Sequence, residues 1–272
     1  MNLEGLKKMA TARADDLFQN ETALVGFRGS IAHGTYIPNT EPDSTDDIDL
    51  MTIHFAPVDH YIGIKSIGNG TIESFVDEWD IVSYEFKKFI HLLIKSNPNV
   101  MSMLWMRDDF YIKRSVFGKL LIDNRNLFSS KKAFSAYTGY AAGQLKKMTA
   151  FTKEGYMGEK RKRLVEELGF DSKNASHCIR LLKQGIEYLG TGEIIVDRTG
   201  IDAEELIAIK RGGLTLEEIK EYAEDLFSES KIALAKSSLP EDPNYERINK
   251  LVSQILYEYI VRSEESLSFY ES

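Results

Sequence analysis

The stretch that decides the fold is GSIAHGTYIPNTEPDSTDDIDL, residues 29–50. It begins with Gly29 and Ser30 after an apolar run, and it ends with Asp47 and Asp49 on either side of Ile48. Glycine lets the backbone approach a phosphate closely, and the start of a following helix supplies N–H donors. Two carboxylates at i and i+2 of a strand lie on one face, close enough to hold a divalent ion. The stretch therefore predicts a phosphate turn beside a metal site.

The pair Asp47 and Asp49 has close competitors, because Asp43 and Asp46 stand nearby and a shift of one residue would present Asp46 instead. We expect Asp47 and Asp49 to be the functional pair, since apolar residues alternate with them as in a half-buried strand. A bare Asp-X-Asp pattern is common in acidic turns. The prediction of a catalytic site therefore depends on the Gly-Ser turn upstream.

A two-metal site usually needs one more carboxylate on a neighbouring strand, which deprotonates or orients the attacking hydroxyl. Asp80 fits this position best, because Trp79 and Ile81 flank it in a strand-like run. Asp77 and Glu78 are the alternatives.

Composition indicates a globular protein with room for two domains. The chain has 272 residues, of which 43% are hydrophobic and 28% charged. Its N-terminus has scattered charges, and no stretch approaches the roughly 20 apolar residues of a membrane span. The single cysteine, Cys178, fits a reducing compartment, and packing is its expected role. We expect a cytoplasmic protein without a membrane segment.

The formal net charge is −8, so any contact with nucleic acid must be local. Residues 146–163 form the best local candidate, because they contain few acids and have aromatic residues interleaved. An ordinary solvated helix surface explains the same pattern equally well. The basic residues of this segment are Lys146, Lys147, Lys153, Lys160, Arg161, Lys162 and Arg163.

Apolar periodicity divides the chain into two halves. The first half predicts a helix over 3–18, strands over 23–29, 48–55 and 60–67, and a strand over 78–96 that becomes helical near Tyr84.

After about residue 110 strand signals almost vanish, apart from a short extended piece at 193–197. We therefore expect an α+β catalytic domain over 1–128 with a small mixed sheet, and an all-helical domain over 129–272 that closes the active-site cleft. The expected helices of the second half cover about 114–125, 130–152, 160–168, 173–189, 202–210, 215–236 and 244–265.

A second group of polar residues lies in the helical half. Lys173, His177 and Arg180 stand at i, i+4 and i+7, on one helical face, with Asp171 or Ser172 as the N-cap. Three potential cations facing one way could receive a triphosphate or an RNA phosphate. The alternative is a solvated basic face on a helix whose other side is core.

His33 follows the predicted phosphate turn. Its imidazole could contact a phosphate or orient the loop, and a capping or packing role is equally consistent with the sequence. Neither a GxxxxGK[ST] run nor a GxGxxG run is present, which argues against those nucleotide-binding folds.

The order GS, loop, DxD and later strand Asp resembles the nucleotidyltransferases of the DNA polymerase β superfamily. The finer motifs GSxAHGT, DDIDL, WDIVSYEFKKF and NPNV resemble one prokaryotic branch associated with RNA repair. The resemblance continues through YMGEKRKRL, LGFDSKNASHCIRLL and YLGTGEIIVDR, so it spans nearly the whole chain.

The resemblance implies a polymerase-β-like core in which Gly29 and Ser30 contact a nucleoside triphosphate (NTP). It also implies that Asp47, Asp49 and Asp80 serve two Mg²⁺ ions, for which Mn²⁺ can substitute. The implied reaction transfers a nucleoside monophosphate to an acceptor hydroxyl, with an RNA end such as that of tRNA as the expected acceptor. A protein-nucleotidylating enzyme and an inactive nucleotide- or RNA-binding module are the alternatives. The NTP and the oligomeric state stay open.

Overall fold

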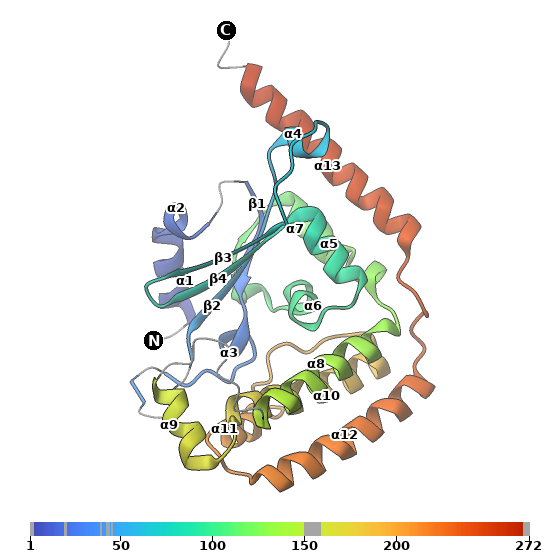
Figure 1. Cartoon of the computed structure of the whole chain (residues 1–272). Helices are drawn as coiled ribbons and strands as arrows, with labels where there is room; N and C mark the ends of the chain where they lie inside the picture. Colours follow the sequence, from blue (N-terminus) through green and yellow to red (C-terminus); the bar gives the residue numbers. More distant parts are fainter. Residues whose placement is uncertain are drawn as a thin grey trace.

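The protein has a small mixed sheet flanked by helices and a group of long helices below it (Figure 1). The computed structural model describes residues 3–18, 21–38, 40–41, 44, 46–149 and 159–268. None of the described helices is long and apolar enough to cross a bilayer.

The sheet has five strands in the order β3-β4-β2-β1-β5. β2 and β4 are parallel, and the other neighbouring pairs are antiparallel. The central strands are mostly apolar, and every residue of β1 and β2 except Asp49 is buried, as expected for a sheet with helices on both faces. The strand bounds are Thr22–Phe27 for β1, Ile48–His54 for β2, Thr71–Val76 for β3, Trp79–Glu85 for β4 and Tyr111–Arg114 for β5.

Helices cover the two faces of the sheet unequally (Figure 1). On one side lie α1 (Leu3–Ala12) and α2 (Ala14–Leu17). On the other lie α5 (Phe86–Ile94), α6 (Pro98–Trp105) and α7 (Val116–Asp123). The short helices α3 (Gly29–Ala32) and α4 (Val58–Tyr61) follow the ends of β1 and β2.

Side-chain caps explain where the middle helices begin. The Glu85 carboxylate accepts hydrogen bonds from the N–H groups of Lys87 and Lys88, so β4 ends there and α5 starts. The Asn97 side chain caps α6 in the same way, and Pro98 occupies its first turn. The change from strand to helix therefore falls at residue 86, slightly later than predicted.

One strand prediction was wrong, and two strands were not predicted. Residues 60–67 are not a strand, because α4 and a loop occupy this region and the side chains of Ile62 and Ile64 are exposed. The strand next to β4 is instead β3, an edge strand whose exposed, mixed polar pattern hides its strand character. β5 was also missed, since four residues are too few for a clear alternation.

The helical half is built around α10 (Ser172–Thr191), which lies against α8 (Lys132–Thr149) and α12 (Leu216–Lys236). α9 (Glu159–Leu168) and α11 (Ala203–Lys210) stand near the start of α10. Gly192 ends α10 in a left-handed conformation, with φ of 76°. Short 3₁₀ turns lie at Asp108–Phe110 and Arg125–Phe128.

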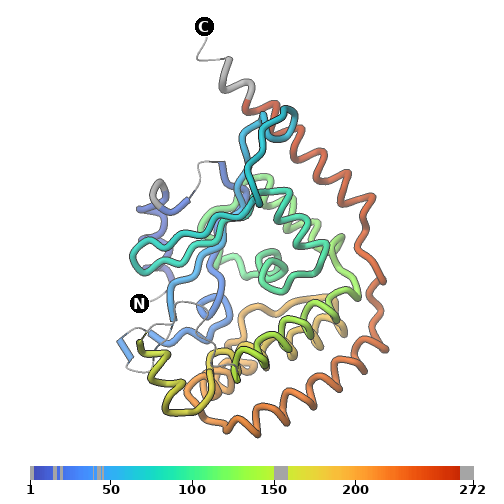
Figure 2. Tube along the Cα trace, in the orientation of Figure 1, coloured from blue at the N-terminus to red at the C-terminus, as the bar shows by residue number. Residues whose placement is uncertain are grey.

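The last helix, α13 (Tyr245–Ser268), leaves the helical group and returns to the sheet end of the molecule (Figure 2). The ring of Tyr259 stacks on Phe55, with centroids 4.3 Å apart, and its hydroxyl donates to the carbonyl of Ala56 at 3.0 Å. The two halves of the chain are therefore interleaved, although the sequence changes character near residue 128.

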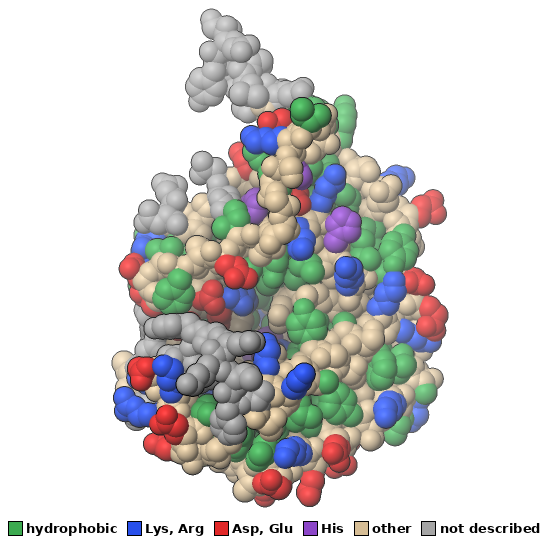
Figure 3. Space-filling model, viewed as in Figure 1, with side chains coloured by type: hydrophobic (Ala, Val, Ile, Leu, Met, Phe, Trp, Pro, Cys, Tyr) green, Lys and Arg blue, Asp and Glu red, His purple; other side chains and the backbone are tan. Residues whose placement is uncertain are grey.

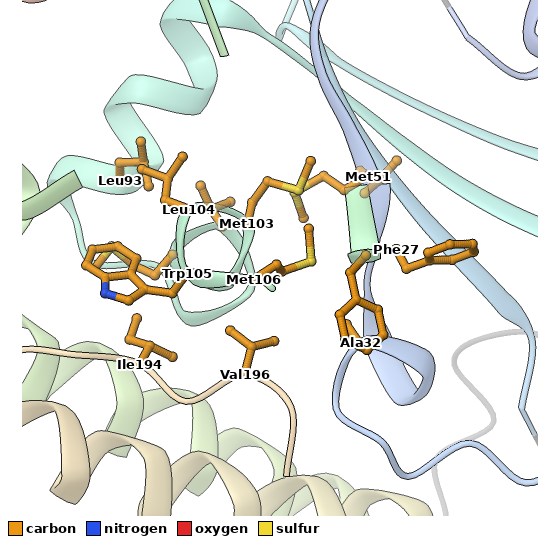
Figure 4. Close-up of a cluster of buried hydrophobic side chains, with 14 of the residues drawn as sticks. Phe27, Ala32, Met51, Leu93, Met103, Leu104, Trp105, Met106, Ile194 and Val196 are labelled. Atoms are coloured by element: carbon orange, nitrogen blue, oxygen red, sulfur yellow. The ribbon is translucent and has the colours of Figure 1, made fainter. Parts of the chain in front are cut away.

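A layer of apolar side chains joins the halves beneath the site (Figure 4). Met103 of α6 and Met106, directly after it, lie toward Phe27 and Met51 of the sheet. On the other side of α6, Ile194 and Val196 are buried below it. They belong to the predicted extended piece, which forms no strand among the described residues. Phe27, Met51, Met103 and Met106 line the cavity described below, so this layer forms its apolar floor.

Candidate active site

Three carboxylates meet at one end of the parallel strand pair. Asp49 of β2 is the register partner of Asp80 in β4, and Asp47 directly precedes β2. Partner residues of adjacent strands have their side chains on the same face, so Asp49 and Asp80 stand side by side. All three line a cavity of about 330 Å³. Acidic and basic side chains gather around the hollow near the middle of Figure 3.

The alternatives for the third carboxylate lie elsewhere. Asp77 forms the turn between β3 and β4 and pairs with Arg13 at 2.8 Å. Neither Asp77 nor Glu78 lines the cavity. The position of Asp80 opposite Asp49 therefore favours Asp80.

Gly29 is needed for two independent reasons. Its φ is +60°, in the left-handed region, and a Cβ atom there would stand 2.1 Å from Oδ2 of Asp49. The turn and the carboxylate can approach each other this closely only because residue 29 has no side chain. Ser30 follows, and its Oγ is buried without a hydrogen-bond partner in the described part of the chain. An unpaired hydroxyl beside a cavity fits an oxygen-rich ligand.

We expect the Gly29→Ala variant to lose most of its activity, because the new methyl group must push the Asp49 carboxylate away. The left-handed backbone adds about 1 to 2 kcal/mol of strain. Gly68→Ala is the matched control, since Gly68 has φ of +73° but nothing within 4 Å of its Cβ position. Urea unfolding and initial rates on both variants separate strain from displacement. Equal activity in the two variants would contradict a role for the close approach.

Asp49 is poorly solvated. Burial raises the pKa of its carboxyl to about 6, and the charge of Asp80 adds to this rise, while Arg28 opposes it. The protein thus holds this acid in an environment that disfavours its charged form, even with Arg28 beside it.

This raised pKa predicts a pH dependence of stability in the presence of EDTA. Below about pH 4 the Asp49 carboxyl is protonated in both the folded and the unfolded chain, so it does not make the free energy of unfolding depend on pH. Between about pH 4 and 6 the carboxyl ionises only in the unfolded chain. The free energy of unfolding should therefore fall by about 2 to 3 kcal/mol as the pH rises through this range. Asp49→Asn removes this component, and urea unfolding of both proteins from pH 4 to 8 measures the difference. Parallel pH curves would contradict the prediction.

The opposite wall of the cavity belongs to α10. Lys173, His177 and Arg180 all line it, and Asp171 caps the helix by accepting from the N–H of Asn174. The structure thus brings all nine predicted site residues, Gly29, Ser30, His33, Asp47, Asp49, Asp80, Lys173, His177 and Arg180, to a single cavity. Their roles stay predictions.

Arg180 is the most informative residue of this wall. Its side chain is 7% exposed, and its one described side-chain partner is the neutral amide oxygen of Gln184, at 2.6 Å. Within the described residues it forms no ion pair, and burial lowers its pKa to about 10. Burial, followed by the charge of Arg180, also holds the pKa of His177 well below its usual value. A buried cation without a carboxylate favours an anionic ligand.

His33 has partners that suit an orienting role. Its Nδ1 lies 3.0 Å from the carbonyl of Val196, so Nδ1 carries the hydrogen, and Arg198 donates its N–H to the carbonyl of His33. Burial lowers the pKa of the imidazole, which is therefore neutral and presents an acceptor at Nε2. Such a ring is poorly suited to contact an ionised phosphate, whereas it ties the turn to the segment below α6.

Asp46, the competitor for the metal pair, also lines the cavity, but protein donors already hold its carboxylate. It is fully buried and accepts from the N–H of Ile37 at 2.9 Å and from Nζ of Lys210 at 2.7 Å. Lys173 stands 3.4 Å from its other oxygen. Burial lowers the pKa of Lys210, and Asp46 counteracts this effect. Lys210 was not singled out in the sequence, because nothing in the pattern of α11 distinguishes it from a surface lysine.

The basic segment is only partly described, since 150–158, with Lys153, lie outside the described residues. Arg161 lines the cavity, but its guanidinium is held by Asp171 at 2.7 Å. Lys162 pairs with Glu159. The exposed residues Lys146, Lys147 and Arg163 are the better candidates for contact with a polyanion.

Comparison with models of protein families gives a match over most of the chain. The family model described as "RNA repair pathway DNA polymerase beta family" matches residues 17–254. The chain belongs to this family. It is therefore a nucleotidyltransferase of the DNA polymerase β superfamily, with the small mixed sheet and helical part expected of that fold.

Other comparisons add little to the family assignment. No curated protein matches the chain. One solved structure that resembles it is the crystal structure of a nucleotidyltransferase-like protein from Exiguobacterium sibiricum 255-15. The two are 12% identical, the match covers 85% of this chain and 74% of that chain, and the TM-score is 0.30. So low a score carries no argument about this chain.

A divalent metal, which the superfamily implies, suits these residues. No group of three or more Asp, Glu, His or Cys side chains among the described residues could hold a metal alone. Mg²⁺, however, is commonly held by one or two carboxylates together with substrate phosphates. Asp49 and Asp80 offer such hard oxygen ligands, and the unpaired hydroxyl of Ser30 lies in the same cavity. The donor set therefore fits Mg²⁺ or Mn²⁺ bound together with a nucleotide.

Proposed function

We propose that this nucleotidyltransferase moves a nucleoside monophosphate from an NTP to an acceptor hydroxyl, releases pyrophosphate and requires Mg²⁺. The observation that supports this most is the opposition of two walls in one cavity. Asp47, Asp49 and Asp80 form one wall, and the buried, carboxylate-free Arg180 stands on the other. A triphosphate between the walls would pair with the guanidinium of Arg180. Its bound metal would pair with the three carboxylates.

In this proposal the chain supplies binding and positioning. Gly29 and Ser30 contact the phosphates, and Lys173, His177 and Arg180 line the side of the triphosphate away from the sheet. Asp47, Asp49 and Asp80 would hold the metal, which when bound neutralises phosphate charge and activates the acceptor hydroxyl. Asp80 accepts the proton of that hydroxyl as its oxygen attacks the α-phosphate in line. Most of the rate then comes from orientation and charge stabilisation.

An RNA end, such as that of tRNA, is the proposed acceptor. Two features support RNA: the description of the family, which names RNA repair, and the exposed basic residues of 146–163. The proposed domains are a catalytic part over 1–128 and a helical part over 129–272, whose α10 forms the far wall. The proposed location is the cytoplasm, where NTPs and tRNA are both present.

Incubation with each α-labelled NTP, Mg²⁺ or Mn²⁺, and either total RNA or total protein tests the proposal. We expect label on RNA, sensitive to ribonuclease and abolished by EDTA. Label on polypeptide alone would indicate a protein-nucleotidylating enzyme. If no label is transferred and the Asp47→Asn, Asp49→Asn double variant keeps the affinity of the wild type for NTP, the protein is a binding module and the proposed reaction is wrong.

A further inference from the structure

We propose that Arg28 is a built-in counter-ion of the strand carboxylates. When the guanidinium of Arg28 moves to the triphosphate of a nucleotide, the carboxylates become available to a divalent metal ion. Metal binding would then depend on nucleotide binding. This inference rests on the proposed function, because it concerns the same carboxylates and the same triphosphate.

The contacts of Arg28 define this role. Its Nη2 lies 3.0 Å from Oδ2 of Asp80 and 3.3 Å from Oδ1 of Asp49, so one nitrogen bridges both acids. Its Nε donates to the carbonyl of Leu50 at 3.2 Å, and its backbone N–H donates to the carbonyl of Asp49 at 3.0 Å. The residue is thus anchored to β2 by its backbone, while its side chain spans the two acids.

A bridging guanidinium and a bridging metal compete for the same oxygens. A divalent ion held by Asp49 and Asp80 would draw on carboxylate oxygens that Nη2 of Arg28 now contacts, and the two positive charges would repel each other at such distances. Without nucleotide, Arg28 offsets the repulsion between two carboxylates that are register partners. The chain therefore already contains the cation that its acids need in the resting state.

A triphosphate offers Arg28 an alternative partner. Arg28 directly precedes the Gly29-Ser30 turn and lines the same cavity, so rotation of its side chain can reach a phosphate bound there without backbone movement. Its side chain is 29% exposed, which leaves room for such a rotation. Guanidinium binds phosphate oxygens by paired hydrogen bonds. Linkage then requires that nucleotide strengthens metal binding and that metal strengthens nucleotide binding by the same factor.

Mn²⁺ binding measured by electron paramagnetic resonance, without nucleotide, tests this directly. We expect Arg28→Gln to bind Mn²⁺ roughly 5- to 100-fold more tightly than the wild type, the usual range of coupling between two ligands. The Mn²⁺ affinity of Arg28→Lys should lie between those of the wild type and Arg28→Gln, because lysine keeps the positive charge but lacks the paired N–H donors of the guanidinium. Lys173→Gln is the matched control, since it also removes a positive charge that acts on Asp49. Its effect should be smaller than that of Arg28→Gln.

The affinity for nucleotide should change in the opposite direction. With EDTA present, a fluorescent N-methylanthraniloyl ATP should bind Arg28→Gln more weakly than the wild type, because one phosphate ligand is missing. Equal Mn²⁺ affinities in the wild type, Arg28→Gln and Arg28→Lys, while the wild type still transfers nucleotide, would overturn the role of Arg28 and leave the proposed function intact. If no protein binds Mn²⁺ and no label is transferred, both proposals fail. If Arg28→Gln does not fold, Arg28→Lys decides, and an affinity equal to that of the wild type overturns the inference.

Discussion

Asp49→Asn is expected to abolish nucleotidyl transfer while the protein stays folded. Asn has the shape of Asp but neither the charge that would hold a divalent ion nor the pairing with Arg28. Loss of metal-assisted charge stabilisation is worth several kcal/mol, so the rate should fall on the order of 10³-fold or more. The fold should survive, because the Asp49 carboxylate is an acid kept in a poorly solvated place and its removal relieves that burial.

Asp77→Asn provides the matched control. Asp77 is an acid of the same hairpin as Asp80, but it pairs with Arg13 in the turn and stands outside the cavity. Single-turnover rates with labelled NTP, beside circular dichroism spectra, should show an inactive Asp49→Asn and Asp80→Asn and an active Asp77→Asn. A fully active Asp49→Asn would contradict the metal-dependent mechanism.

More of the candidate site than of the sheet could be predicted from the sequence. The Gly29-Ser30 turn, the alternation around Asp49 and the face of α10 are local patterns, and each survives in the structure because local geometry determines it. Edge strands such as β3 carry no such signal: what makes residues 71–76 a strand is their pairing with β4, which one-dimensional periodicity does not contain.

The contacts missed at the site are those that link distant segments. Arg28 bridges acids 21 and 52 positions away, and its position in an apolar strand run gave no reason to single it out. For His33 the sequence left phosphate contact, loop orientation and packing open, and only the structure shows its carbonyl and ring contacts with Arg198 and Val196. Long-range pairing of this kind becomes visible only once the chain is folded.

The largest effect on stability is expected from Lys210→Met. The side chains of Lys210 and Asp46 are 5% and 0% exposed, and their ion pair joins α11 to the loop before β2. Lys210 also donates to the carbonyl of Thr35 at 2.8 Å, so two segments of that loop depend on one ammonium group. Removing Lys210 leaves the buried Asp46 carboxylate with Lys173, at 3.4 Å, as its one remaining described cation, so the loss should approach the roughly 3 to 5 kcal/mol of a broken buried pair.

The double variant Asp46→Asn, Lys210→Met separates the buried charge from the contact itself. Without the carboxylate no ion is left unpaired, so the double variant should recover a large part of the stability lost by Lys210→Met alone. Arg211→Met is the surface control, because Arg211 pairs with Glu41 of the same loop but is exposed, and its loss should change the unfolding free energy by less than about 1 kcal/mol. Urea unfolding of the four proteins measures these differences. If Lys210→Met and Arg211→Met are equally stable, the buried pair does not fix the loop that leads to Asp47 and Asp49, and the placement of these carboxylates must depend on the sheet alone.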